Sequence, residues 1–295
     1  MNPQSGCSKI SLGTAQFGIP YGVANHSGIV PRTEVKAMLK IASANKIDAL
    51  DTAISYGESE TCLGEVGTQG FNLITKLPAL PDGCRDVSTW VQNQVAESFS
   101  RLNVKAIYGL LLHRPEQLLG PNGNALYQAL QALKGKGQVE KVGVSIYSPD
   151  ELTSLNSLFG FDIVQAPFNL IDRRLHSTDS LKRLKDDGVE VHTRSAFLQG
   201  LLLMSHIERP AKFLPWQSLW KSWHSWLEEH GVSAVQACLG YPLSFPEIDR
   251  VIVGADDLKQ LTQILSAVNS PLFGDLPDLQ CGDEALINPS NWSKL

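Results

Sequence analysis

The chain alternates eight times between a short apolar run typical of a β-strand and a stretch with helical periodicity. The apolar runs are nearly continuous, as expected of parallel strands that are covered on both faces. Strand–helix units of roughly 30–40 residues predict a single α/β domain over residues 1–295, a (β/α)8 TIM barrel with parallel strands. A doubly wound sheet would alternate in the same way, but no G-x-G-x-x-G motif follows the first candidate strand. The candidate strands are residues 9–13, 49–51, 71–76, 107–113, 141–145, 162–166, 189–193 and 250–254.

The predicted helices fill the intervals between these strands, and one of them runs from residue 175 to residue 187. Two segments do not fit the strand–helix pattern. The connection from Met204 to Trp216 contains proline and tryptophan, and the tail over residues 271–295 carries scattered Pro, Gly and Asp, which predicts an irregular C-terminal cover. Because loops set the specificity of a barrel, we expect both segments to form pocket walls. A tryptophan stripe over residues 216–226 has helical spacing and is more typical of packing against the barrel than of a ligand platform.

Composition excludes several classes of function. The formal net charge is -5 and the pI is near 5.8, which argues against a nucleic-acid or anionic-membrane surface. We expect no membrane span, because no apolar run reaches the length of about 18 residues that a span needs. The five cysteines form no CxxC pair, which argues against a metal or disulfide framework and favours a reducing, cytoplasmic location.

Polar residues end three consecutive candidate strands. Asp51 ends the second strand, Lys76 the third and His113 the fourth, and Tyr56 follows Asp51 in the next loop. The chemistry of a barrel lies at the C-terminal ends of its strands, and neighbouring strands are ~4.8 Å apart, so Asp51 and Lys76 are expected within contact range. A tyrosine has a reference pKa of ~10 and becomes a useful acid near neutral pH when a neighbouring cation stabilises its phenolate. Lys76 can supply that cation.

Each of these four residues also has a structural interpretation. Asp51 could cap a turn, Lys76 could be a solvated strand end, His113 a hydrogen-bonded core histidine, and Tyr56 a packing aromatic. Their combination at the ends of successive strands favours a shared active site over four separate structural roles.

The order of several motifs resembles that of the aldo/keto reductases, with bacterial members as the nearest type. The resemblance covers nearly the whole chain, and the pairing of DTA-x-x-YG with LLLH is specific. It implies a nicotinamide-dependent carbonyl reductase that uses no metal. The motifs are LGTAQFG (12–18), LDTAISYGESETCLG (50–64), ITK (74–76), LLLHRP (110–115), GVS (143–145), VQAPFN (164–169) and VIVGADDLKQL (251–261).

The resemblance implies a role for each of the four polar residues. Tyr56 would donate the proton, Lys76 would lower the pKa of Tyr56, Asp51 would pair with Lys76, and His113 would orient the substrate carbonyl. This division of labour matches the chemistry, because hydride arriving at a carbonyl carbon creates alkoxide character on the oxygen. The redox step belongs to the cofactor, and the protein supplies orientation.

The resemblance also implies a cofactor site along the strand ends. Ser145 and Gln165 match a serine and a glutamine that hold the nicotinamide carboxamide, and Gly254 at a helix start leaves room for a phosphate near backbone N–H groups. The other implied cofactor positions are Gly13, Thr14, Arg194, Ser195, Phe197, Gly200 and Lys259.

Two positions and one segment depart from the family pattern. Ile146 stands where an asparagine partner of the carboxamide is expected, and Arg194 stands where an aromatic residue stacks on the nicotinamide. A planar guanidinium can stack on a ring, but it would repel an oxidised nicotinamide; pairing with a carboxylate or with an anionic substrate is the alternative. Asp256 and Asp257 occupy the segment where a 2′-phosphate would meet basic residues, and Lys259 is the one nearby cation.

The sequence thus predicts an NAD(P)H-dependent oxidoreductase that reduces an aldehyde or ketone to the alcohol. NADP(H) is the expected cofactor, and NAD(H) is the alternative. The segment RSAFLQGLL (194–202) resembles bacterial members linked to sugar or polysaccharide metabolism, so a sugar derivative is one candidate substrate. A monomer or small homo-oligomer is expected. The alternative is a cofactor-sensing regulatory subunit with little or no catalysis, as in relatives of voltage-gated potassium channel β subunits. A metal-dependent isomerase or hydrolase would need more clustered carboxylates and histidines. Physiological substrate and reaction direction stay open.

Overall fold

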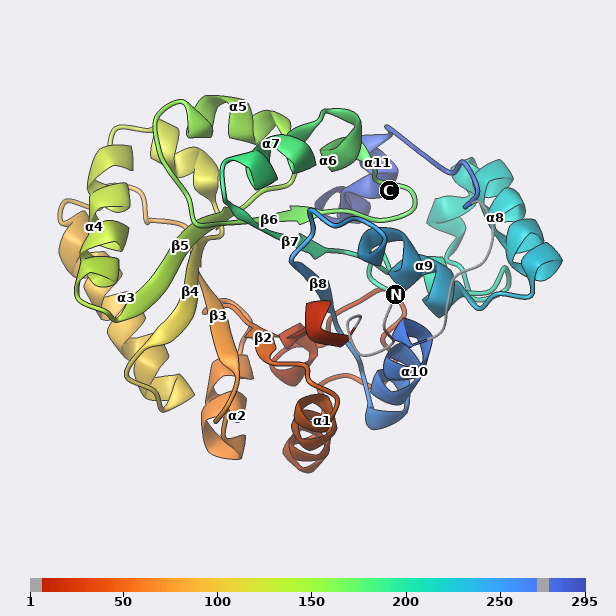
Figure 1. Ribbon diagram of the computed structural model, residues 1–295, viewed down its shortest axis with the longest axis horizontal. Helices are drawn as coiled ribbons and strands as arrows, with labels where there is room; N and C mark the ends of the chain where they lie inside the picture. The colour runs from red at the N-terminus through yellow and green to blue at the C-terminus, as the bar shows by residue number, and fades with distance from the viewer. Residues whose placement is uncertain (1–6, 270–275) are drawn as a thin grey trace.

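Eight parallel strands form a closed barrel in the computed structural model, which describes residues 7–269 and 276–295 (Figure 1). Each strand pairs with the next one along the chain, and the last pairs with the first. The predicted TIM barrel is therefore confirmed. The strands are β1 (Ile10–Gly13), β2 (Ala49–Asp51), β3 (Asn72–Leu77), β4 (Ile107–Leu112), β5 (Val139–Ser145), β6 (Ile163–Pro167), β7 (Glu190–Arg194) and β8 (Arg250–Val253).

Helices surround the barrel, and α8 lies at its periphery on the right of Figure 1. No described helix combines the length and apolar character needed to cross a bilayer. The helices are α1 (Arg32–Ala44), α2 (Ser59–Val66), α3 (Val87–Leu102), α4 (Gly123–Gly135), α5 (Asp150–Asn156), α6 (Arg174–Ser177), α7 (Ser180–Asp186), α8 (Gln217–His230), α9 (Ala234–Leu243), α10 (Leu258–Val268) and α11 (Glu284–Ile287). Short 3-10 helices are η1 (Cys7–Lys9), η2 (Ala15–Phe17), η3 (Pro115–Leu119), η4 (Leu201–Leu203), η5 (Ala211–Trp216) and η6 (Pro289–Lys294).

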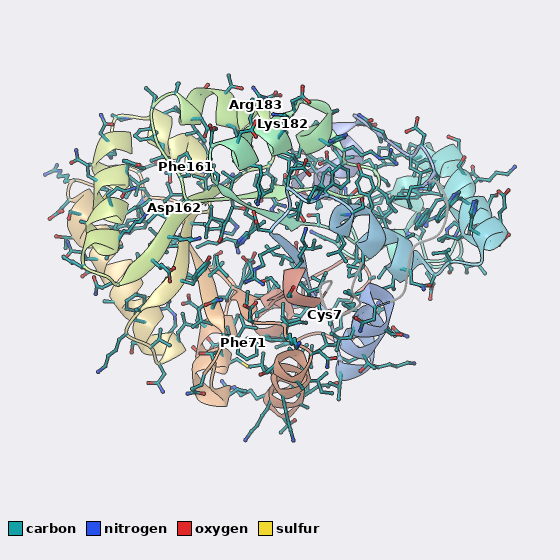
Figure 2. The ribbon with its side chains drawn as sticks, viewed as in Figure 1. Cys7, Phe71, Phe161, Asp162, Lys182 and Arg183 are labelled. Carbon is teal, nitrogen blue, oxygen red and sulfur yellow. The ribbon has the colours of Figure 1, made fainter. Side chains whose placement is uncertain are left out.

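The helix α7 shows why these segments are helical. Leu181 and Leu184, three positions apart, are buried against the barrel, whereas Lys182 and Arg183 are exposed at its outer edge (Figure 2). This spacing places apolar side chains on one face of the helix and charges on the other.

The helix predicted over residues 175–187 is divided in two. Asp179 has a φ of 55°, in the left-handed region, which interrupts the helical hydrogen bonds between α6 and α7. The Thr178 hydroxyl donates to the Arg174 carbonyl at 2.8 Å and satisfies an acceptor at the end of α6. Apolar periodicity alone does not reveal such a break.

The described part of the C-terminal tail is more ordered than an irregular cover. Residues 276–295 include α11 and η6, with Leu286 and Trp292 buried. They pack on the segment after β6, where the Cys281 N–H donates to the Ile171 carbonyl at 3.0 Å. Residues 271–275 lie outside the described ranges.

The tryptophan stripe packs as expected. Trp220, Trp223 and Trp226 are all buried. The Trp223 indole N–H donates to the Leu202 carbonyl at 3.0 Å, which satisfies its polar atom inside the core. The stripe fixes α8 on the segment after β7.

Large apolar side chains fill the inside of the barrel, and a glycine lets two of its strands approach closely. Ile74, Leu111 and Ile163, from three different strands, form a buried interior cluster with Ala49. A Cβ on Gly143 would lie 2.0 Å from the Ile163 carbonyl oxygen, so only a glycine lets the two strands come this close. The interior is thus a packed core, and ligand chemistry is confined to the ends of the strands.

We predict that Leu111→Ala lowers the free energy of unfolding by about 2–5 kcal/mol, because it leaves a cavity in this interior cluster. Urea unfolding followed by fluorescence would measure the change. Leu158→Ala is the matched control, since Leu158 is 64% exposed and its truncation is expected to change stability by less than about 0.5 kcal/mol. Equal losses in the two variants would contradict the packing of this interior.

Candidate functional site

A buried ion pair lies at the ends of β2 and β3. The Lys76 ammonium donates to Asp51 Oδ1 at 2.6 Å and to the Thr52 carbonyl at 2.8 Å. The parallel register pairs Asp51 with Ile74, so both side chains emerge at the same end of the barrel. Burial lowers the pKa of Lys76, and the Asp51 carboxylate acts in the opposite direction. The predicted contact between these two residues is present.

A hydrogen-bond chain continues from this ion pair toward the opposite side of the barrel. Gln165 Nε2 at the end of β6 donates to Asp51 Oδ2 at 2.7 Å, and Ser145 Oγ at the end of β5 donates to Gln165 Oε1 at 3.2 Å. Both carboxylate oxygens of Asp51 are therefore occupied. Gln165 orients Asp51 and is itself held by Ser145, two contacts that the sequence did not predict.

Tyr56 is positioned by a tight turn after β2. The Tyr56 N–H donates to the Ala53 carbonyl at 3.0 Å, and the Ser59 N–H donates to the Tyr56 carbonyl at 3.0 Å. A Cβ on Gly18 would lie 1.9 Å from the Tyr56 carbonyl oxygen, so only glycine lets the segment after β1 pass this closely. The buried Ser59 hydroxyl then joins that segment to the turn by donating to the Thr14 carbonyl at 2.8 Å.

Three of the predicted catalytic side chains lie together. Lys76 Nζ is 5.3 Å from the centroid of the Tyr56 ring, and the rings of Tyr56 and His113 have centroids 6.1 Å apart at an angle of 78°. Asp51 lies beneath them through its contact with Lys76. All four residues predicted from the strand ends therefore converge on one site.

The pKa of Tyr56 differs from the sequence-based expectation. Burial raises the pKa of the phenol above its ordinary value, the charge of Asp51 raises it further, and the Arg194 guanidinium lowers it. A lowered value was expected from Lys76, but Asp51 at 2.6 Å offsets the lysine charge. Tyr56 is consequently a protonated phenol at neutral pH, which suits a proton donor.

His113 is held in its neutral form. Burial lowers the pKa of His113 to about 4, and the nearby charges of Lys76 and Arg194 act in the same direction. Its Nδ1 lies 3.3 Å from the Ser55 hydroxyl, a partner that sequence reasoning missed. A neutral imidazole can donate one hydrogen bond to a substrate oxygen while accepting another.

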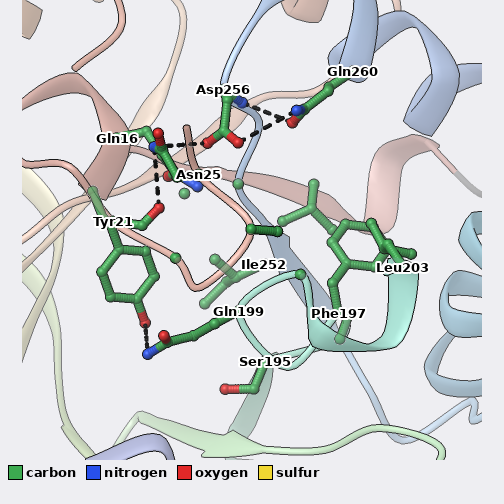
Figure 3. Close-up of a pocket in the computed structure, with 18 of the residues that line it drawn as sticks. Gln16, Tyr21, Asn25, Ser195, Phe197, Gln199, Leu203, Ile252, Asp256 and Gln260 are labelled. Atoms are coloured by element: carbon green, nitrogen blue, oxygen red, sulfur yellow. Dashed lines mark hydrogen bonds between the residues drawn. The ribbon is translucent and has the colours of Figure 1, made fainter. Parts of the chain in front are cut away.

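A cavity of about 460 Å³ opens beside Tyr56 and Asp51 and extends over the ends of β1, β7 and β8 (Figure 3). Its volume lies within the range of small-molecule sites, about 300–1,000 Å³. Met204 and Glu208 line it, so part of the predicted 204–216 wall is present, whereas residues 276–295 are not among its lining. The predicted cofactor residues that line it are Gly13, Thr14, Gln165, Arg194, Ser195, Phe197, Gly200 and Gly254.

Two predicted cofactor residues do not line this cavity. Ser145 is buried beneath Gln165, and Lys259 is exposed on α10. The expected cation of the segment after β8 is therefore absent from the cavity wall. Asp256 takes part in the wall, whereas the Asp257 carboxylate accepts the Gln260 N–H at 2.6 Å and caps α10.

Arg194 lies at the end of the cavity nearest Tyr56. Its guanidinium donates to the Ile146 carbonyl at 2.9 Å and stands 4.6 Å above the Tyr147 ring centroid. No ion pair to a carboxylate is found for it within the described ranges 7–269 and 276–295. The alternative in which Arg194 pairs with a carboxylate of the chain is thus not formed among the described residues, and the Arg194 charge acts on Tyr56 and His113.

The segment between β1 and α1 supplies cavity residues that sequence reasoning missed. Gln16, Tyr21 and Asn25 all line the cavity (Figure 3). The Val23 N–H donates to the Gln199 carbonyl at 3.1 Å, which ties the segment to the loop after β7. The eighteen-residue interval between β1 and α1 is long for a barrel connection, and this length could have identified the segment as a functional loop.

Comparison with known proteins supports the resemblance seen in the sequence motifs. The sequence profile of the Aldo/keto reductase family matches residues 9–275, which confirms the resemblance seen in the motifs. The chain is 25% identical over 215 residues to the aldo-keto reductase YhdN of Bacillus subtilis, a match covering 66% of this chain. It spans 60% of the length of that curated relative.

Solved structures share the fold. The holo form of the aldo-keto reductase AKR11C1 from Bacillus halodurans gives a TM-score of 0.73 at 19% identity, covering 90% of this chain and 88% of that one. PA4992 from Pseudomonas aeruginosa gives a TM-score of 0.66 at 21% identity, covering 88% of this chain and 89% of that one. At these identities the likeness concerns the barrel itself.

We predict that His113 makes stability depend on pH. Its pKa of about 4 is lower than the ~6.5 of an unfolded histidine, so its contribution is complete above pH 6.5 and is lost as the pH falls toward 4. The free energy of unfolding is expected to fall by about 3 kcal/mol over this range of pH. Urea unfolding at several pH values should show a shallower decline for His113→Gln than for the native chain. An NMR titration midpoint for His113 near 6.5 would contradict this environment.

Proposed function

The chain belongs to the Aldo/keto reductase family, an oxidoreductase family acting on carbonyl compounds, and from this premise we propose that it is an NAD(P)H-dependent reductase of an aldehyde or ketone. The observation that carries the proposal is the convergence of Tyr56, His113 and the Asp51–Lys76 pair, of which Tyr56 and Asp51 line the cavity. A cytoplasmic location and a monomeric or small homo-oligomeric state remain predictions from the sequence.

The side chains of this site divide the work at the carbonyl oxygen. A bound nicotinamide supplies the hydride for the carbonyl carbon. Tyr56, protonated because burial raises its pKa, donates a proton to the oxygen as negative charge develops there. His113, neutral because its pKa is lowered, donates a hydrogen bond to the same oxygen.

Lys76 acts once the proton has left Tyr56. Its ammonium, 5.3 Å from the ring centroid, stabilises the phenolate that remains. Asp51 favours the charged form of Lys76, and Gln165 fixes the second carboxylate oxygen of Asp51. The pair thus stabilises the product state of proton transfer more than the resting phenol.

The residues along the cavity fit a nicotinamide dinucleotide. A Cβ on Gly254 would approach the Gln16 side chain to 2.5 Å, so the glycine lets Gln16 lie against the segment after β8. Phe197 offers an apolar surface for a ring, and the Gln165 amide, with one N–H still available, can hold a carboxamide. Arg194 and Ser195 add polar donors near the Tyr56 end.

Tyr56→Phe is expected to lower kcat/KM for carbonyl reduction by about 10²–10⁴-fold, since it removes the proton donor. NADH and NADPH binding, followed by quenching of tryptophan fluorescence, should change little. Tyr127→Phe is the matched control, because the Tyr127 hydroxyl donates to the Gly160 carbonyl outside the cavity. Turnover retained by Tyr56→Phe would remove Tyr56 from the acid role; cofactor binding without turnover in the native chain would favour the regulatory alternative.

Lys76→Met is expected to lower kcat/KM and to move the basic limb of its pH profile upward, because the phenolate of Tyr56 loses its cation. The same change leaves Asp51 buried and unpaired, at a cost of about 3–5 kcal/mol. The double variant Asp51→Asn with Lys76→Met separates the two effects, since it should recover stability in urea without recovering turnover. An unchanged pH profile in Lys76→Met would rule out the role of its charge.

A further inference from the structure

The far end of the cavity lies between the segment after β1 and the start of α10. Gln16 and Asn25 come from the first of these, and Asp256 and Gln260 from the second (Figure 3). If the nicotinamide lies against Tyr56, as the proposed function requires, the adenosine half of the dinucleotide extends toward this far end. The side chains there then decide which adenosine the site accepts.

Asp256 is surrounded by neutral donors. Asn25 Nδ2 donates to Asp256 Oδ1 at 3.2 Å, Gln260 Nε2 donates to Oδ2 at 3.3 Å, and Gln16 adds a further side-chain hydrogen bond. The Asp256 N–H donates to Gln260 Oε1 at 2.9 Å, which fixes the residue in the wall. Within the described ranges no lysine or arginine forms an ion pair with this carboxylate. The Asp256 carboxylate is therefore hydrogen-bonded to neutral groups, and no ion pair with a described lysine or arginine neutralises its charge.

The charges of the cavity wall are unevenly distributed. Arg194 lies at the Tyr56 end, where it contacts Ile146 and Tyr147. At the far end the basic group is the exposed His26, which interacts electrostatically with both Asp256 and Glu208. A phosphate monoester carries about −1.5 to −2 charges at neutral pH, so two carboxylates and one histidine form an unfavourable site for it.

A ribose hydroxyl has the opposite requirement. It is neutral and donates a hydrogen bond, so a carboxylate fixed by amides is a suitable acceptor. An acidic residue that accepts from the ribose 2′-hydroxyl is also the device by which other dinucleotide sites select NAD.

We propose that Asp256 is a specificity-determining residue that makes this chain bind NAD(H) in preference to NADP(H). Its carboxylate accepts a hydrogen bond from the adenosine ribose and repels a 2′-phosphate. Asp257 is not the ribose acceptor, because its carboxylate caps α10. The inference rests on the proposed function and favours NAD(H), the cofactor left open beside the expected NADP(H).

Equilibrium binding of NADH and NADPH to the native chain, by tryptophan fluorescence or calorimetry, tests the proposal. NADH is expected to bind at least about tenfold more tightly, and the gap should narrow as NaCl is raised, because salt screens repulsion between charges. Competition by fragments requires no variant: ADP should displace NADH at lower concentration than 2′,5′-ADP. NADPH binding as tightly as NADH would overturn the proposal and leave the proposed function standing.

Matched variants assign the effect to one carboxylate. Asp256→Asn keeps the shape of the side chain and removes its charge. It is expected to reduce the difference in affinity between NADH and NADPH to less than about threefold, mainly by improving NADPH binding. Asp257→Asn removes a charge one residue away, retains a side chain that can cap α10, and should leave the gap unchanged. Equal gaps in the native chain and in Asp256→Asn would overturn the assignment. Binding of neither cofactor to the native chain would overturn the proposed function and this inference together.

Discussion

The buried pair of Asp51 and Lys76 is the interaction on which the rest of the site depends. Removing two charges from water costs several kcal/mol per ion, which is offset only when both groups are fully hydrogen-bonded. Here Thr52 supplies a carbonyl to Lys76, and Gln165 supplies an amide to Asp51 from a strand 114 residues further along the chain. That contact requires a closed barrel, since β2 and β6 lie on opposite sides of it. Closure of the barrel therefore brings the polar residues of the candidate site together.

Sequence reasoning located the strands and the four polar residues at their ends because both follow from the same constraint. Parallel strands covered on both faces must be apolar, so a polar residue at the end of one marks the edge of the barrel. The pKa of Tyr56 was not predictable in this way. Its direction is set by burial and by the charges of Asp51 and Arg194, whose effects depend on distances rather than on residue types.

The conformations of the loops could not be predicted from the sequence for a related reason. The break before α7 depends on the left-handed conformation of Asp179, and the segment after β1 depends on contacts with distant loops. Gly200, for example, has a φ of 89° and sits where a Cβ would lie 2.6 Å from Ala24. Both residues line the cavity. Glycine permits it, but the sequence does not say which loop the glycine will meet.

The charges lining the cavity separate structural from ligand-directed groups. Asp51 is neutralised by Lys76, and Glu208 and His26 are exposed to water, where a charge costs little. Arg194 and Asp256 are partly buried without an ion-pair partner within residues 7–269 and 276–295, so each retains a field that the chain does not cancel. Keeping these two charges partly buried costs desolvation free energy in the free protein, and this cost is offset when a ligand of matching polarity binds. Because the two charges are opposite and lie at opposite ends, the cavity distinguishes the two ends of an elongated ligand as well as its charge.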